Sequence, residues 1–220
     1  MMRLFVLMIG PTAMILLGLQ GLNSMLYTFA LFYGWLLLIP LADGLLQKKS
    51  TLSENLKQLG FRVHKKNLKY GLILGIVLLV VIPMTVALLR PLLFDVTELK
   101  PLLQAWGFSR HAVWYIVILV VVNPLLEEIY WRCYMYRKLE KKLHAGLAIG
   151  LTSIFYSLYH LLWLVPMFEW PCDVLAVLLV FMAGLLWGWM YRKQRSLLGG
   201  FISHALADVG IVAVYLIYLQ

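Results

Sequence analysis

Seven apolar segments dominate this 220-residue chain and constrain its fold more than any other feature. Each is close to the roughly 20 residues that an α-helix needs to cross about 30 Å of hydrocarbon. Only helices or closed barrels satisfy their backbone polar groups in lipid, so we predict an all-α, polytopic transmembrane helical bundle of about seven spans, six to eight. The segments are 4–19, 25–41, 70–89, 112–133, 145–165, 174–191 and 197–219.

The composition supports a membrane protein, because 63% of the residues are hydrophobic and only 13% are charged. Soluble domains carry about twice that share of charged residues. The first segment also has some features of a signal peptide, since Arg3 precedes an apolar run. Pro11 interrupts that run and no small-residue cleavage site follows before Met25, so we expect the segment to be retained as a span.

The net charge is +9, and the basic residues are concentrated in particular loops rather than on one face of the protein. With seven spans, 15 of the 19 lysines and arginines fall on one side of the membrane, whereas Arg90, Lys100 and Arg110 fall on the other. Cytoplasmic loops carry such an excess, which predicts a cytoplasmic N-terminus and an outer C-terminus. We therefore expect the partner of these basic residues to be the lipid bilayer and not nucleic acid.

Two amphipathic stretches between the spans predict short interfacial helices. One lies in the polar segment 42–69, and the other, 91–106, is bracketed by Pro91 and Pro101. In the first, the apolar residues at helical spacing are Leu52, Leu56 and Leu59. We find no internal repeat and no soluble domain, so residues 1–220 are predicted to form a single membrane domain.

Ionisable side chains inside the apolar segments give the strongest indication of function. A charged residue at a helix centre costs at least ~2.5–3.5 kcal/mol, so such residues usually pair or line a hydrated cavity. By helical rise, the two histidines, the first glutamate and the aspartate lie roughly 10 to 22 Å from the predicted cytoplasmic helix ends, which favours one shared site. The residues are Glu127, Glu128, Arg132, His160, His204 and Asp208.

Spacing along each helix divides these residues into two groups. Glu128 and Arg132 are four residues apart, which predicts an ion pair that supports the structure. Glu127 points about 100° away from Glu128 around the helix, so we expect it to face the cavity. His204 and Asp208 are also four residues apart and share a helix face.

Hydrolysis is the chemistry that these residue types favour. A buried glutamate can act as the general base that activates water, and one histidine can orient that water or protonate the leaving amine. The second histidine and a polar neighbour can stabilise the tetrahedral oxyanion. This mechanism needs no cofactor. A zinc ion bound by Glu127, His160 and His204 is the alternative, which the sequence leaves open although it lacks the HExxH spacing.

Three motifs resemble those of the CPBP family, the CAAX-protease and bacteriocin-processing intramembrane endopeptidases. That family carries EExxxR, FxxxH, and HxxxN or HxxxD, in this order. The chain has EEIYWR from Glu127, YSLYH ending at His160, and HALAD from His204, across roughly residues 110–215. Tyr156 stands where the family prefers phenylalanine.

The resemblance implies a catalytic core over 111–216, preceded by variable N-terminal helices over 1–110. It implies that Glu127 activates water beside His160, and that His204 and Asp208 form the oxyanion site. It also implies a mechanism that does not depend on a metal. Where the family has asparagine, Asp208 is a poorer oxyanion donor, because a carboxyl group donates a hydrogen bond only when it is protonated.

The expected substrate is a membrane-associated peptide or protein that is cut from the cytoplasmic side. The short loops and the charge asymmetry favour a prokaryotic plasma membrane, where secreted peptides, bacteriocins or signalling precursors are more plausible clients than prenylated proteins. Two other functions are considered: a non-catalytic scaffold or bacteriocin-immunity protein, and a proton-coupled transporter. The intact motifs disfavour the first, and the lack of inverted repeats disfavours the second. The sequence does not predict an oligomeric state.

Overall fold

The computed structural model describes residues 2–47 and 60–220. Within them, seven helices are long and apolar enough to cross a membrane, and no β-strand is present, so the predicted polytopic helical bundle is confirmed. The residues Leu52, Leu56 and Leu59 of the first predicted interfacial helix lie outside this part of the chain. The spans are Met2–Gly21, Met25–Gly44, Lys65–Leu93, Ser109–Leu139, Ala145–Leu164, Cys172–Gln194 and Leu198–Tyr218.

Most spans are a single α-helix, but the first and fourth include π-helical segments. The first span comprises α1 (Met2–Leu16) and η1 (Leu17–Gly21), and the other simple elements are α2 (Met25–Gln47), α4 (Lys65–Leu93), α5 (Val96–Ala105), α9 (Ala145–Leu164), α10 (Cys172–Gln194) and α11 (Leu198–Tyr218). The fourth span is built from η2 (Ser109–His111), α6 (Ala112–Val117), η3 (Ile118–Val122), α7 (Asn123–Glu128), η4 (Ile129–Tyr136) and α8 (Arg137–Leu139).

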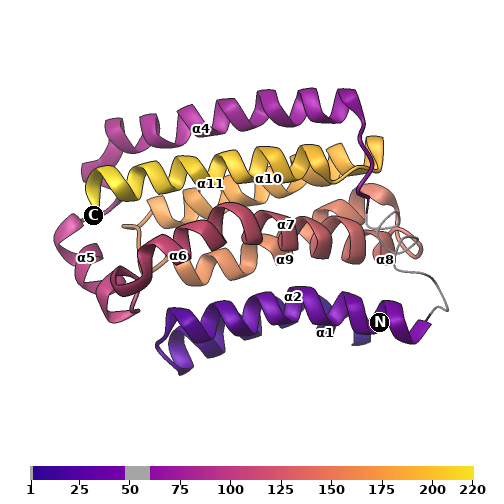
Figure 1. Ribbon diagram of the computed structural model, residues 1–220, viewed down its shortest axis with the longest axis horizontal. Coiled ribbons are helices and arrows are strands. Elements are labelled where there is room, and N and C mark those ends of the chain that lie inside the picture. Colours follow the sequence, from indigo (N-terminus) through magenta and orange to yellow (C-terminus); the bar gives the residue numbers. More distant parts are fainter. Residues whose placement is uncertain (1, 48–59) are drawn as a thin grey trace.

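The spans run side by side along the long axis of the molecule (Figure 1). Helices α4 and α11 lie on one side, α1 and α2 lie on the opposite side, and the fourth span passes between them. Helix α7 contacts both α2 and α11. Its polar residues are therefore enclosed by protein and not by lipid.

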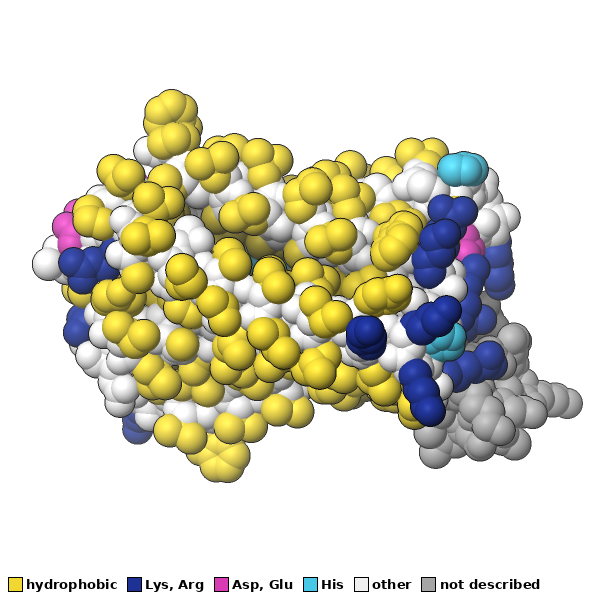
Figure 2. All heavy atoms as spheres, turned by 90° about the horizontal axis from the view of Figure 1, so that it is seen from above, with side chains coloured by type: hydrophobic (Ala, Val, Ile, Leu, Met, Phe, Trp, Pro, Cys, Tyr) yellow, Lys and Arg dark blue, Asp and Glu magenta, His cyan; other side chains and the backbone are white. Residues whose placement is uncertain are grey.

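The outer surface is that of a membrane protein. Hydrophobic side chains cover the body of the face seen in Figure 2, whereas lysine and arginine gather at the end that carries the N-terminus and α8. Large apolar residues such as Leu72, Ile76 and Leu179 are about half exposed or more, at 50%, 49% and 68%. Exposure on this scale is expected where lipid covers the protein.

The second predicted interfacial helix is shorter than the sequence pattern suggested. Helix α4 continues through Pro91 to Leu93, and α5 begins only after Asp95. The Asp95 carboxylate accepts a 2.7 Å hydrogen bond from the backbone N–H of Thr97, which is a typical N-cap contact. This cap, and not a proline, sets the boundary, and Pro101 lies inside the helix. The prediction that two prolines bracket the helix was therefore wrong.

Helices α4 and α11 approach closely because glycines line their contact. A Cβ atom added to Gly71 would lie 2.4 Å from the backbone oxygen of Gly199. The backbone N–H of Gly199 donates a 2.6 Å hydrogen bond to Asn67 Oδ1. Small residues allow backbones to approach in this way, and the resulting dispersion and polar contacts drive helix association in lipid. The contact holds α11, which carries His204 and Asp208, in place.

We expect Gly71→Ala to destabilise the protein by about 1–3 kcal/mol, because the new methyl group would press on the α11 backbone. The free energy of unfolding in mixed micelles measures this effect. Gly34→Ala on α2 is the matched control, since a Cβ atom there meets nothing within 4 Å. Equal stabilities of the two variants would contradict the packing argument.

Candidate active site

The adjacent glutamates lie at the end of the short helix α7, between the π-helical segments η3 and η4. Pro124 lies inside the continuous fourth span, where its missing amide donor interrupts the backbone hydrogen bonds between η3 and α7. Widened π turns occur frequently at functional sites. Glu127 is 1% exposed and Glu128 is 0% exposed, so both carboxyl groups are held inside the bundle.

The ring of His204 lies among three carboxyl groups. Its Nε2 atom is 3.6 Å from Glu127 Oε2 and 3.8 Å from Asp208 Oδ2, and its Nδ1 atom is 3.7 Å from Glu128 Oε1. These separations are longer than direct hydrogen bonds but allow strong electrostatic interaction. Trp187 stacks on the imidazole with ring centroids 4.3 Å apart, which fixes the plane of the ring.

Arg132 and Glu128 form the contact that their spacing predicts. Arg132 Nη1 lies 3.3 Å from Glu128 Oε1, and both side chains are buried. The guanidinium carbon is also 4.8 Å from the ring centroid of Tyr156 and 5.4 Å from that of Trp187. Glu128 is therefore neutralised by an arginine, whereas Glu127 lies beside His204 Nε2.

His160 lies on α9 and is held by its own helix. Its Nδ1–H donates a 2.8 Å hydrogen bond to the backbone oxygen of Tyr156, which leaves Nε2 as an acceptor. The ring packs against Tyr156 and Tyr159, with centroids 4.7 Å and 4.5 Å away. In the described part of the chain, no hydrogen bond or ion pair joins His160 to Glu127. The structure thus brings Glu127, His204 and Asp208 together, and the Tyr156 ring packs against both His160 and His204.

Two tyrosine hydroxyl groups in the site were not assigned from the sequence. The Tyr159 hydroxyl lies near the Glu127 carboxylate and accepts a 3.2 Å hydrogen bond from Trp131 Nε1. The Tyr156 hydroxyl lies 3.4 Å from His204 Nε2. Both residues belong to YSLYH, where their i, i+3 spacing beside His160 is a signal that could have identified them. Tyr159 positions the carboxylate of Glu127.

A comparison with protein families matches the part of the chain that carries these residues. Residues 109–210 match the family model described as type II CAAX prenyl endopeptidase Rce1-like, and the match includes every residue of the site from Glu127 to Asp208. These residues belong to the CAAX-protease family. Peptide-bond hydrolysis within the membrane is the general activity of that family. No curated protein and no solved structure matches the chain.

A helix outside the CAAX-protease region also reaches the site. The Tyr33 hydroxyl of α2 donates a 3.2 Å hydrogen bond to Asn123 Oδ1. Asn123 Nδ2 in turn donates to Asp208 Oδ2 at 3.4 Å. No motif marks Tyr33 or Asn123, so sequence reasoning missed both. The N-terminal helices therefore help to position an acidic residue of the CAAX-protease site.

The zinc ligands considered from the sequence do not fit a metal ion in this structure. Among the described residues, no group of three or more histidine, cysteine, aspartate and glutamate side chains has the geometry to hold one. His160 directs Nδ1 at a backbone carbonyl and packs against the rings of Tyr156 and Tyr159.

Proposed function

We propose that the chain is an intramembrane endopeptidase in which Glu127 activates a water molecule to attack the peptide bond of a membrane-associated substrate, with 111–216 as its catalytic core. The observation that carries this proposal is the environment of Glu127. Its carboxylate is buried, lies near the Tyr159 hydroxyl and is 3.6 Å from His204 Nε2. A general base needs such a fixed position close to the reacting proton.

The reaction proceeds in two steps that balance in protons. Glu127 removes a proton from water as the water oxygen bonds to the substrate carbonyl carbon, which gives a tetrahedral intermediate. The carbon–nitrogen bond then breaks, and the protonated Glu127 transfers its proton to the leaving amine. No covalent bond to the protein forms, and no metal takes part in either step.

Stabilising the oxyanion needs hydrogen-bond donors, and the carboxylates of the site supply only acceptors. Asp208 already accepts from Asn123, so we assign it a positioning role toward His204. The donors assigned to the oxyanion are the protonated His204 ring and the Tyr156 hydroxyl, which lies 3.4 Å from His204 Nε2. The tyrosine that replaces the family's phenylalanine thus compensates for an aspartate that cannot donate.

We expect Tyr156→Phe to lower kcat by about 10²-fold with little change in KM, because an oxyanion donor acts mainly in the transition state. The aromatic ring, and its packing against Trp131 and Trp187, is retained. In an Asp208→Asn background the new amide can donate in its place, so the same substitution should cost less. Tyr70→Phe, on the exposed face of α4, is the control. An unchanged kcat in Tyr156→Phe would remove the hydroxyl from the mechanism.

The direct test uses purified full-length protein in detergent with internally quenched peptides. We expect cleavage that persists when a chelator is added. Loss of activity on chelation, restored by Zn²⁺, would replace the proposed mechanism with a metal-dependent one. Cleavage absent from every peptide and from native membranes would favour the scaffold or immunity function.

The proposed location is a prokaryotic plasma membrane with a cytoplasmic N-terminus and an outer C-terminus. The gathering of lysine and arginine at the end that carries the N-terminus supports this orientation (Figure 2). Secreted peptides, bacteriocins and signalling precursors are the proposed substrates. Mass spectrometry of membrane peptides from wild-type and Glu127→Ala strains should show precursors that accumulate only in the variant.

A further inference from the structure

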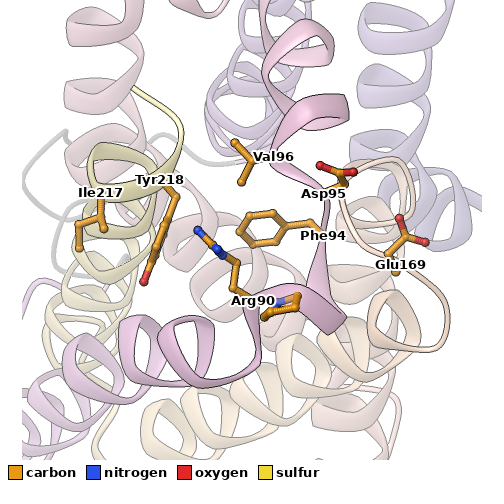
Figure 3. A pocket seen from close by; sticks show the side chains of 8 residues that line it. Arg90, Phe94, Asp95, Val96, Glu169, Ile217 and Tyr218 are labelled. Carbon is orange, nitrogen blue, oxygen red and sulfur yellow. The ribbon is translucent and has the colours of Figure 1, made fainter.

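A pocket of about 620 Å³ lies at the end of the molecule opposite the N-terminus, where α4 ends and α5 begins. Figure 3 shows its walls, which also include the loop before α10 and the end of α11. None of the residues proposed for catalysis lines it. The residues that matter for binding are Arg90, Phe94, Asp95, Glu169, Ile217 and Tyr218.

Charges of opposite sign occupy opposite sides of this pocket. Arg90 points toward Tyr218 on one side of Phe94, whereas Asp95 and Glu169 lie on the other side (Figure 3). The guanidinium carbon of Arg90 is 5.3 Å from the Tyr218 ring centroid, a cation–π contact that leaves its N–H edge free for an anion. Within the described residues, none of the three charged groups forms an ion pair. The pocket is therefore complementary to a ligand that carries a separated anion and cation.

Backbone and ring contacts fix the two walls relative to each other. The backbone N–H of Glu169 donates a 2.8 Å hydrogen bond to the Leu93 oxygen, which ties the loop before α10 to the end of α4. The rings of Phe94 and Phe168 pack edge to face with centroids 5.9 Å apart. Asp95 is held as the N-cap of α5. The charged groups thus project from a rigid frame.

The surroundings of the pocket indicate a lipid ligand. Leu88, Leu92 and Ile217 are 76%, 66% and 64% exposed, and they belong to the spans that end at the pocket. Ile217 lines the pocket itself, so an acyl chain would lie along the exposed apolar surface of these spans next to it. The pocket is therefore at the level of lipid headgroups.

We propose that this pocket binds the headgroup of phosphatidylethanolamine, with the phosphate on Arg90 and the ammonium group between Asp95 and Glu169. A guanidinium group recognises phosphate through paired N–H donors. The ammonium group can donate three hydrogen bonds to carboxylates, whereas the quaternary amine of choline has no N–H. A phosphatidylglycerol headgroup has no cation for the acidic wall.

The test uses full-length protein in detergent, titrated with short-chain phosphatidylethanolamine, phosphatidylcholine or phosphatidylglycerol. Native mass spectrometry counts the bound lipid, and the thermal unfolding midpoint gives its affinity. We expect one phosphatidylethanolamine to bind, and its affinity to fall about tenfold in Arg90→Gln and in Glu169→Gln, because each variant loses a charged hydrogen bond. Arg110→Gln, an exposed arginine outside the pocket, should bind like the wild type.

Each result decides part of the proposal. Equal affinity for phosphatidylglycerol, or unchanged affinity in both pocket variants, would overturn it. Glycerophosphoethanolamine, which lacks acyl chains, should bind far more weakly than the lipid. If it bound equally well, the ligand would be a soluble phosphate amine and not a membrane lipid. The readouts do not depend on proteolysis, so the result is independent of the proposed enzyme function.

Discussion

Glu127→Gln is expected to lower kcat by about 10³-fold, the central value for the loss of a general base. Glutamine has nearly the same shape, but its amide does not remove a proton from water. KM should change little, because the carboxylate acts on the water and not on substrate binding. Initial rates with a quenched peptide, measured on purified protein in detergent, give both constants.

Glu98→Gln is the matched control for this substitution, because Glu98 is an exposed glutamate on α5, far along the chain from the site. It should retain the wild-type rate. The thermal unfolding midpoint of Glu127→Gln should stay close to that of the wild type, which shows that lost activity is not lost folding. A Glu127→Gln protein that keeps more than about a tenth of the wild-type kcat would exclude this residue as the base.

Glu128→Met is expected to destabilise the protein by about 3–5 kcal/mol, the usual cost of leaving one member of a buried ion pair without its partner. Arg132 is 3% exposed, so water cannot replace the lost carboxylate. The remaining contacts of its guanidinium group, with Tyr156, Trp187 and the Gly184 oxygen, do not neutralise the charge. The free energy of unfolding in mixed micelles measures this loss.

The double variant Glu128→Met with Arg132→Met tests the cause of that loss. Because both charges are removed together, it should be closer in stability to the wild type than Glu128→Met alone. If the two substitutions were simply additive, the pair would not be coupled, and Glu128 would stabilise the fold through other contacts. The double variant should remain folded, with Glu127 still on α7.

Much of the architecture could be predicted from the sequence, because lipid imposes strict requirements on a chain. Only long apolar helices satisfy their backbone in hydrocarbon, so the length and composition of the segments predicted all seven spans. Ionisable residues inside such segments are costly, and this cost pointed to Glu127, Glu128, His160, His204 and Asp208. The Glu128–Arg132 contact followed from helical spacing alone, since it lies within one helix.

Local polar contacts, such as helix caps and tyrosine hydroxyl groups, were harder to predict from the sequence. The sequence pattern suggested that prolines bracket the interfacial helix, but the Asp95 side chain sets its start. Capping depends on the conformation of one or two residues, which apolar periodicity does not record. The same limit applied to YSLYH. The motif predicted a role for His160, but no role was predicted for the hydroxyl groups of Tyr156 and Tyr159.

What the sequence by itself determined is the set of helices and the face on which each polar residue lies, because both depend on periodicity within one segment. Only the tertiary structure decided which faces meet. It placed His204 among three carboxyl groups, Tyr159 against Glu127, and Tyr33 of α2 against Asn123, 90 residues away. It also formed the pocket between Arg90 and Glu169. Such contacts depend on how helices pack side by side, through close approaches such as Gly71 against Gly199, and no pattern along a single helix contains that information.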